Sequence, residues 1–589
     1  MISSRLSLSF CLLTTAALLS TANAQTPTPS PTVEPTYSTV LVFGDSLSDV
    51  GNLRHRFEDS YSIGYPGGDF NYSDGRFTNS TDTSPSSQNF VGVWHEQLSR
   101  DFLGLPASTN DLDGGDDFAF GGATTEDGSQ DYTIVNGPFG QDATVRIDNM
   151  GAQVDAYVTR RTVDPAALFA VWGGGNDIFN DDTDANVTAT ASRMAMLVSK
   201  LADAGARLFL VPNVPPLGGV PRYSDDEATQ ATKNRASAAY RGQLDSNLNA
   251  VVAMFAAKGI HLDLKRLDIW SLFVRFVSDP AKYGFTDFLH SSQGNDVNPD
   301  VFLFWDDIHP TTAAHYQIAT EANRVLTGAA ATPGRALNVS TRATVGEGEN
   351  ASVGGFIVSG SVAKRVILRG IGPSLASHGI SNALPNPVIE LFDASGNSLA
   401  LNDNWEDSQS AEIAATGLAP TNPLESAIVR NLPPGGYTVR LSGKDVPTGV
   451  GLVEVYDLGK GAKSMLANVS TRASVGTGDD VMIAGVIVGS GGDPIVVVRA
   501  IGPSLANGGI VNALQDPMLE LYNINGDQIA ANDNWRDGQP TATKATLLEP
   551  SDDREAVIVG SLPPDSYTAI VRGKDNTTGV ALVEVYRIP

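Results

Sequence analysis

The sequence predicts an α/β domain with a doubly wound parallel sheet, followed by two all-β sandwich domains. In the first half of the chain, short apolar runs alternate with stretches of helical spacing, which is typical of a parallel sheet covered by helices. In the second half, the segment NVSTRA begins at Asn338 and again at Asn468, 130 residues later, and further segments recur at the same offset. A repeat of this length indicates duplication of a whole domain rather than a solenoid of short units.

The chain begins with the features of a secretory signal peptide. Arg5 precedes an apolar run that ends in the small residues Ala-Asn-Ala, so we expect residues 1–24 to be removed on export. The only cysteine, Cys11, leaves with them, and the secreted chain therefore contains no disulfide. Residues 25–37 are rich in Pro and Thr, which predicts an extended linker.

Three apolar runs predict strands of the parallel sheet. They cover residues 40–43, 167–172 and 207–211, and each is followed by a turn rich in Gly, Pro or Asn. Residues 192–205 place apolar side chains on one helix face and end in a glycine, which predicts a helix between the last two strands. Ligands of such folds bind at the carboxyl edge of the sheet, so chemistry is expected in the turns that follow these runs.

The last helix of the α/β domain is expected to start at Pro310, which suits a first helical position, and to stop at Gly328. Each copy of the repeat contains β-rich runs separated by Gly, Pro and Asn turns, which indicates an antiparallel sandwich. The expected order is 38–328 for the α/β domain, 329–336 for a linker, 337–460 for the first sandwich, 461–466 for a linker and 467–589 for the second sandwich.

The composition excludes several classes of partner. A formal net charge of −27 would repel nucleic acids and anionic lipid surfaces over the whole molecule. After the signal peptide, no stretch approaches the roughly 20 unbroken apolar residues that a membrane-spanning helix needs. We therefore expect a secreted protein with no nucleic-acid partner and no transmembrane segment.

Ser46 stands in the segment VFGDSLSDVGN, directly after the first predicted strand. A sharp turn at the end of a strand exposes a hydroxyl at the edge of the sheet, which is typical of a nucleophile. A Gly-Asp-Ser turn also occurs in loops without chemistry. The interpretation therefore depends on partners elsewhere in the chain.

A serine nucleophile needs a base and a group that orients the base. The segment WDDIHP offers His309 as the base and Asp306, three residues before it, as the orienting carboxylate. Asp307 is the alternative carboxylate, but its two-residue spacing makes the contact less natural. His309 could instead be a surface histidine at the start of a helix.

The oxyanion that forms during attack on an ester needs hydrogen-bond donors already aimed at it. Gly122, in DDFAFGGATT, offers a backbone N–H, and Asn176, in GGGND, offers a side-chain amide after a predicted strand. Taken alone, each segment is equally typical of an ordinary tight turn.

Taken together, these four segments resemble the four sequence blocks of the GDSL, or SGNH, hydrolase family. The resemblance covers residues 38–328 and implies a flavodoxin-like three-layer αβα fold. The segments FGDSLSDVGN, VPNVPPLG and YGF look most like the long-chain branch that holds plant GDSL lipases, bacterial autotransporter esterases and lecithinase-type haemolysins. Family members usually carry Asn where Asp117 stands here, which leaves the register of Gly122 against Gly121 open.

The resemblance implies acyl transfer through a covalent intermediate. His309, held by Asp306, would deprotonate Ser46, and the oxyanion would rest on the Ser46 N–H, the Gly122 N–H and the Asn176 amide. No cofactor is required, and the histidine spacing gives no reason to expect a catalytic metal.

The two copies of the repeat offer less chemistry. The segment NDNW, at Asn402 and Asn532, is either a turn or a calcium loop, and the turn is favoured. Trp405 and Trp535 are either core residues or platforms for sugar rings, and the core is favoured. Each copy resembles the pre-peptidase carboxyl-terminal sandwich of secreted bacterial enzymes, which implies targeting or binding modules, for example toward a polysaccharide or a cell surface.

These observations predict a secreted carboxylic ester hydrolase, an esterase or lipase whose substrate is a lipid, aryl or acylated carbohydrate ester. Within this class, a phospholipase and a carbohydrate acetyl esterase are the alternatives. Outside it, the alternative is a surface adhesin whose hydrolase domain is a relic.

Overall fold

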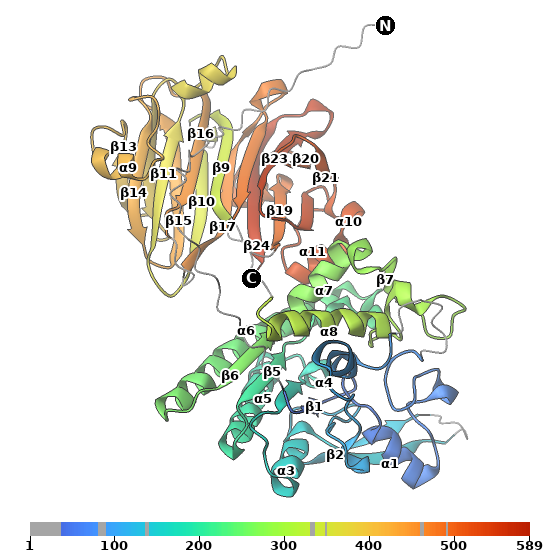
Figure 1. Ribbon diagram of the computed structural model, residues 1–589. Coiled ribbons are helices and arrows are strands. Elements are labelled where there is room, and N and C mark those ends of the chain that lie inside the picture. Colours follow the sequence, from blue (N-terminus) through green and yellow to red (C-terminus); the bar gives the residue numbers. More distant parts are fainter. Residues whose placement is uncertain are drawn as a thin grey trace. The chain divides into compact units, whose positions relative to one another are not determined.

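The computed structural model describes residues 37–80, 90–135, 141–329, 336–347, 350–459, 464–489 and 493–588. The expected signal peptide and most residues of the expected linkers lie outside these ranges. The described residues divide into two compact units, of which the first covers 37–329 and the second covers most of 336–588 (Figure 1). No helix in the described part of the chain is long and apolar enough to cross a membrane.

The first unit is built on a parallel sheet with the strand order β1-β4-β5-β6. The segment around Asp117 runs parallel to the free side of β1, because the Phe118 N–H donates to Val42 O at 2.8 Å. Numbered in chain order, the strands then follow 2-1-3-4-5, the flavodoxin-like doubly wound order. The three predicted strands and the α/β fold class are confirmed. The strands of the sheet are the three predicted ones, β1 (Val40–Gly44), β4 (Leu168–Trp172) and β5 (Leu208–Pro212), and a fourth, β6 (Asp263–Leu267).

Helices cover both faces of this sheet (Figure 1). Successive residues of a strand point to opposite faces, so Phe169 and Val171 of β4 enter one core with α3, α5 and α6. Trp172 points the other way and meets Trp94 of α2, with ring centroids 5.5 Å apart, and α8 contacts α2 on that side. The helices are α1 (Asn52–Tyr61), α2 (Trp94–Gln97), α3 (Met150–Arg160), α4 (Gly175–Asn180), α5 (Asp184–Ala204), α6 (Glu227–Ala257), α7 (Ile269–Ser278) and α8 (Thr312–Leu326). Two short strand pairs complete the unit: β2 (Ser129–Ile134) with β3 (Ala143–Asp148), and β7 (Asp287–Ser291) with β8 (Phe302–Phe304).

The start of α8 corrects the sequence analysis. Thr311 is the N-cap residue, and its Oγ1 accepts the Ala314 N–H at 3.2 Å. Pro310 therefore lies before the helix, in an extended bridge to Phe304, and its prediction as the first helical residue was wrong. A threonine hydroxyl that satisfies a free N–H at the helix start determines the boundary more strongly than the fixed φ of proline. The end of α5 before Gly205 was predicted correctly.

The strands of the second unit form one continuous sheet, made of two antiparallel runs that each pass through both copies of the repeat and are joined where β9 pairs parallel with β17. One follows the order β14-β11-β16-β9-β18-β23-β20-β21, and the other follows β13-β12-β15-β10-β17-β24-β19-β22. Strands β9 to β16 belong to the first copy and β17 to β24 to the second. The strands of the first copy are β9 (Ala336–Val345), β10 (Ser352–Gly360), β11 (Lys364–Ile371), β12 (Pro387–Asp393), β13 (Ser398–Asn402), β14 (Ser426–Leu432), β15 (Gly435–Gly443) and β16 (Gly449–Asp457). Those of the second are β17 (Ser464–Val475), β18 (Met482–Val488), β19 (Ile495–Ile501), β20 (Pro517–Tyr522), β21 (Gln528–Asn532), β22 (Ala556–Ser561), β23 (Ser566–Gly573) and β24 (Gly579–Ile588). Short helices α9 (Ser410–Ala415), α10 (Trp535–Gly538) and α11 (Pro540–Thr546) lie outside the sheet.

Equivalent residues of the two copies meet where the two runs join. Thr471 donates a hydrogen bond from Oγ1 to Oγ1 of Thr341, its own counterpart in the first copy, at 2.8 Å. Two further hydrogen bonds form a symmetric pair: replacing each residue of one bond by its counterpart in the other copy gives the residues of the other bond, as expected around a two-fold axis. These pairs are Asn382 with Asp480 at 3.0 Å and Asn512 with Asn350 at 2.9 Å. The copies are therefore related by a pseudo-two-fold axis near Thr341 and Thr471.

The all-β prediction for the repeats is confirmed, but their expected separation into two sandwich domains needs correction. The strands β9 and β10 of the first copy pair with β18 and β17 of the second, and one hydrophobic core contains residues of both copies. A repeated sequence shows which segments form strands. It carries no signal for whether a strand pairs within its own copy or with the other copy.

This pairing predicts the effect of removing the second copy. A chain that ends at residue 459 would leave β9 and β10 with unpaired edges, and exposed edges recruit other chains. We expect the shortened protein to form a two-fold dimer or to aggregate, whereas the full chain does not need a partner for these edges. Size-exclusion chromatography with light scattering measures the difference. A soluble monomer that melts cooperatively would contradict the prediction.

Candidate active site

Ser46 lies in the turn that follows β1. All five residues of β1 are buried, so the sheet determines where the turn begins. The Asp45 carbonyl oxygen accepts the N–H groups of Ser48 and Asp49, both at 3.0 Å, and the Asp45 carboxylate accepts the Leu47 N–H at 3.1 Å. Burial raises the pKa of Asp45 to about 6. Held in this way, the turn places Ser46 on the wall of a cavity.

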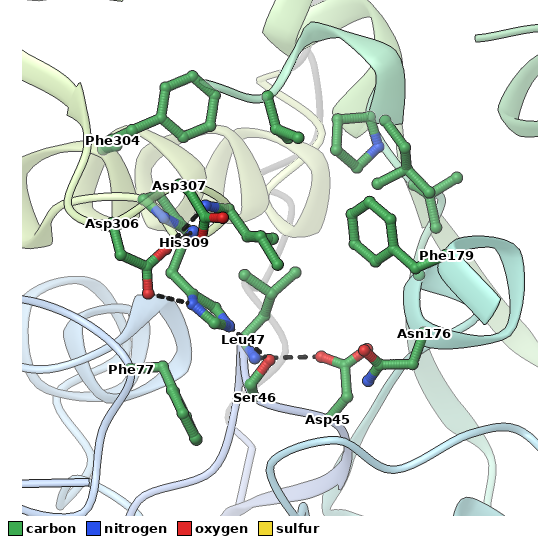
Figure 2. A pocket seen from close by; sticks show the side chains of 18 of the residues that line it. Asp45, Ser46, Leu47, Phe77, Asn176, Phe179, Phe304, Asp306, Asp307 and His309 are labelled. Atoms are coloured by element: carbon green, nitrogen blue, oxygen red, sulfur yellow. Dashed lines mark hydrogen bonds and ion pairs between the residues drawn. The ribbon is translucent and has the colours of Figure 1, made fainter. Parts of the chain in front are cut away.

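His309 faces Ser46 inside that cavity. Its Nε2 lies 2.8 Å from Ser46 Oγ, and its Nδ1 lies 2.6 Å from Asp306 Oδ2 (Figure 2). An ionised carboxylate can only accept hydrogen bonds, so Nδ1 carries the ring proton and donates to Asp306, and Nε2 accepts the Ser46 O–H. The Ser46 hydroxyl, the His309 imidazole and the Asp306 carboxylate thus form a chain of hydrogen bonds, in which the imidazole is placed to take the proton from Ser46 Oγ.

Asp306 is held by several donors. Its Oδ1 accepts the N–H groups of Ile308 at 2.7 Å and His309 at 2.6 Å, and its Oδ2 also accepts the Tyr72 O–H at 2.7 Å. Burial alone would raise the pKa of Asp306, but His309 and the backbone donors outweigh burial and hold the pKa well below its ordinary value. Phe77 stacks on the His309 ring, with centroids 4.9 Å apart. The carboxylate and the imidazole therefore keep one geometry.

Asp307, the alternative carboxylate, turns away from His309. Arg222 donates to both of its carboxylate oxygens, at 2.8 and 3.1 Å, and the Arg222 N–H donates to its carbonyl oxygen at 3.0 Å. The structure therefore brings Asp306, and not Asp307, to His309.

The backbone hydrogen bonds at Gly121 and Gly122 differ, and the sequence left open which of the two glycines matches the oxyanion-hole position. The Gly121 N–H donates to Asp49 Oδ2 at 2.8 Å and is occupied. Gly122 lines the cavity with Ser46, and no acceptor among the described residues contacts its N–H. Gly122 has φ +81°, and an added Cβ would lie 2.5 Å from the Tyr132 ring, so the position requires glycine. Its N–H is the one available to a ligand.

Asn176 reaches the same cavity from the start of α4, the helix that follows β4. Its Nδ2 donates to Ala123 O at 2.9 Å, which leaves the second N–H of the amide for a ligand. The structure thus brings all five predicted residues to one cavity: Ser46, Gly122, Asn176, Asp306 and His309.

An ion pair between buried Asp177 and half-buried Arg193, which the sequence analysis did not single out, joins the segments of Gly122 and Asn176. Asp177 accepts Arg193 Nη2 at 2.8 Å, and it also accepts the Thr125 N–H at 3.0 Å and the Thr125 hydroxyl at 2.7 Å. Arg193 donates from Nε to the same hydroxyl at 2.8 Å. The only signal in the sequence was the acidic residue next to Asn176, because Arg193 lies on a helix with no motif.

The cavity has a volume of about 320 Å³. One end carries the polar groups described above, and the rest is lined mainly by apolar side chains from α7, α8, β8 and the turn after β5. This is the composition of a small-molecule site, in which a few polar groups orient an otherwise apolar ligand.

No cluster of three or more potential metal ligands occurs among the residues that the structure describes. In the first NDNW segment, the Asn402 side chain donates to Asn404 O at 2.9 Å and accepts the Ala427 N–H at 2.8 Å, so it closes a turn. Trp535 is 2% exposed and packs in the protein interior. Its ring is therefore not available as a platform for sugars.

Residues 40–322 match the sequence profile of the GDSL-like lipase/acylhydrolase family. The chain is 25% identical to GDSL esterase/lipase 6 of Arabidopsis thaliana, over 47% of this chain and 83% of that protein. It is 24% identical to the phosphatidylcholine-sterol acyltransferase of Aeromonas hydrophila, over 49% of this chain and 90% of that protein. It is 30% identical to esterase EstA of Pseudomonas aeruginosa, over 52% of this chain and 48% of that protein.

Among solved structures, the chain is similar to a member of the lipolytic protein G-D-S-L family from Veillonella parvula. The identity is 13%, the match covers 49% of this chain and 97% of that one, and the TM-score is 0.25.

Proposed function

We propose that this protein is a secreted carboxylic ester hydrolase that works through a serine acyl-enzyme, because residues 40–322 match the sequence profile of the GDSL-like lipase/acylhydrolase family. The observation that carries the proposal is the continuous set of hydrogen bonds from Asp306 through His309 to Ser46 at the polar end of the cavity. Secretion is inferred from residues 1–24, and a targeting or binding role is proposed for the two repeats.

In the proposed first step, His309 Nε2 takes the Ser46 proton while Ser46 Oγ forms a bond to the ester carbonyl carbon. The oxyanion accepts hydrogen bonds from the N–H groups of Ser46 and Gly122 and from the free N–H of Asn176. When the tetrahedral species collapses, the bond to the alcohol oxygen breaks, and His309 returns the proton to that oxygen. Asp306 stabilises the imidazolium that exists between the two transfers.

In the second step, water replaces the alcohol. His309 takes a proton from the water, and the resulting hydroxide bonds to the acyl carbon. The bond to Ser46 Oγ then breaks, and the proton returns to Ser46. The products are a carboxylic acid and the free enzyme, and no cofactor takes part.

A burst experiment tests the proposal. Mixing the secreted form with excess p-nitrophenyl butyrate is expected to release close to one p-nitrophenolate per chain before steady state, provided that loss of the acyl group is slower than its formation. Labelling with a fluorophosphonate, followed by peptide mass spectrometry, is expected to find the label on Ser46. The adhesin with a relic hydrolase domain predicts neither turnover nor label.

Removal of the Asn176 amide tests its role as an oxyanion donor. Asn176→Ala is expected to lower kcat by about 10²- to 10³-fold, because the lost hydrogen bond strengthens only in the transition state. KM is expected to change little for the same reason. Steady-state kinetics on p-nitrophenyl butyrate measure both constants. Asn247→Ala, on α6 and outside the cavity lining, is the matched control and should behave like the wild type.

A further inference from the structure

Helix α7 is apolar on more than one side. Eight of its ten residues are buried, although a helix that packs on one side needs only one apolar stripe. Ile269, Leu272, Phe273 and Phe276 follow the spacing i, i+3, i+4, i+7, so they share one face, and all four line the cavity. The cavity face of α7 therefore carries no polar side chain.

Other elements extend this apolar wall. Leu303 of β8 and Ile318 of α8 line the same cavity, as do Val214 and Leu217 from the turn after β5. Each of these side chains is at most 5% exposed, so the wall is removed from bulk water. A buried apolar wall around an open volume of about 320 Å³ offers space that an aliphatic chain fills better than water does.

The shape of the wall depends on close packing. An added Cβ at Gly219 would lie 2.7 Å from the Phe273 ring, so the ring rests directly on that glycine. Ala314, fully buried on α8, is a small lining residue that leaves volume open. The open volume of the cavity thus depends on small residues, Gly219 and Ala314, that stand beside large side chains such as Phe273.

The charged side chains at the cavity argue against recognition of the substrate mainly through a charged headgroup. The only Lys or Arg among the described lining residues is Arg222, and both oxygens of Asp307 occupy its guanidinium. A phosphate group finds no unpaired cation among the described lining residues. Recognition must come mainly from the apolar part of the ester.

We propose that the apolar part of this cavity is an acyl-chain subsite, and that the enzyme prefers esters of medium-chain fatty acids to acetate esters. The inference rests on the proposed function, because it assumes that the acyl group is bonded to Ser46. The acyl group is the part that stays in the site while the alcohol leaves and water enters. A buried apolar wall suits the part that stays, and it disfavours a carbohydrate acetyl esterase.

The experiment is a chain-length series of p-nitrophenyl esters from acetate to palmitate, with kcat/KM measured for the secreted form. Each buried methylene strengthens transition-state binding by up to about four-fold. Octanoate is therefore expected to exceed acetate by at least about 100-fold, and the gain should stop when the cavity is full. A second series, with a fixed acetyl group and alcohols of increasing length, should show no comparable gain.

Leu272→Trp tests the wall itself. The indole would occupy part of the cavity, so the ratio of kcat/KM for octanoate to that for acetate is expected to fall at least ten-fold and the preferred chain length to shorten. The matched control is Leu289→Trp, which makes the same change at a side chain that is 43% exposed and outside the cavity lining. Its ratio should equal that of the wild type. Thermal melting identifies any variant that has simply lost its fold.

The outcomes separate the two proposals. A wild type that hydrolyses acetate as fast as octanoate, or that gains with alcohol length instead of acyl length, overturns the acyl subsite and leaves the ester hydrolase intact. An unchanged ratio in folded Leu272→Trp also overturns it. A folded wild type that hydrolyses none of the esters and takes no fluorophosphonate at Ser46 overturns the proposed function itself.

Discussion

Ser46→Ala is expected to lower kcat by about 10⁴- to 10⁶-fold, because it removes the atom that bonds to the acyl carbon. The residual rate would come from the oxyanion donors and from substrate binding, which the substitution leaves in place. The fold should persist. Ser46 loses one hydrogen bond to His309, which is worth about 1 kcal/mol, and alanine fits the space of serine.

The measurement combines steady-state turnover of p-nitrophenyl octanoate with the burst amplitude, and the burst should disappear with the turnover. Ser192→Ala is a matched control, because Ser192 lies on α5 outside the cavity lining and its hydroxyl donates to the Thr188 carbonyl oxygen of the same helix at 2.9 Å. A Ser46→Ala protein that retains more than a few per cent of wild-type turnover would show that another group is the nucleophile.

Asp306→Asn is expected to lower kcat/KM by about 10⁴-fold. An asparagine amide can present an N–H to His309 Nδ1, which stabilises the tautomer whose Nε2 carries the proton and cannot accept one from Ser46. The substitution also removes the negative charge that stabilises the imidazolium. Because the pKa of Asp306 lies well below its ordinary value, this charge is present in the wild type throughout the range in which an ordinary aspartate is ionised.

The neighbouring Asp307→Asn is the sharpest available control. It makes the same chemical change one residue away, and it weakens only a half-exposed ion pair with Arg222, so kcat/KM should change by less than about three-fold. Circular dichroism and melting curves of both variants establish that each is folded. Equal losses in the two variants, or a larger loss in Asp307→Asn, would contradict the assignment of Asp306.

How far the sequence predicted the site depends on how local each signal is. Ser46 and Gly122 stand in turns of distinctive sequence, and Asn176 stands in the distinctive segment that opens α4. Asp306 precedes His309 by the three residues that let their side chains meet. These patterns act within a few residues, so they can be read without a structure. The choice of Asp306 over Asp307 also agreed with the contacts that the structure shows.

The interactions that support the site depend on residues far apart in the chain. Asp177, paired with Arg193, holds the start of α4 to Thr125 in the segment of Gly122, and Tyr72 reaches Asp306 across more than 200 residues. Tyrosine and arginine occur too often for their positions to suggest such contacts. Only the packing of α5 and of the loops around the sheet brings them to the site.

The sequence alone predicted the α/β order of the first unit and the all-β character of the repeats, since strand runs and helix faces are short-range patterns. It proposed the five residues of the candidate site through the resemblance of four segments taken together. Only the tertiary structure reveals the exchange of strands between the two copies and the apolar cavity beside α7. Each of these depends on which distant surfaces pack together. That choice is made by complementary shape and burial over the whole unit, and no local run of residues encodes it.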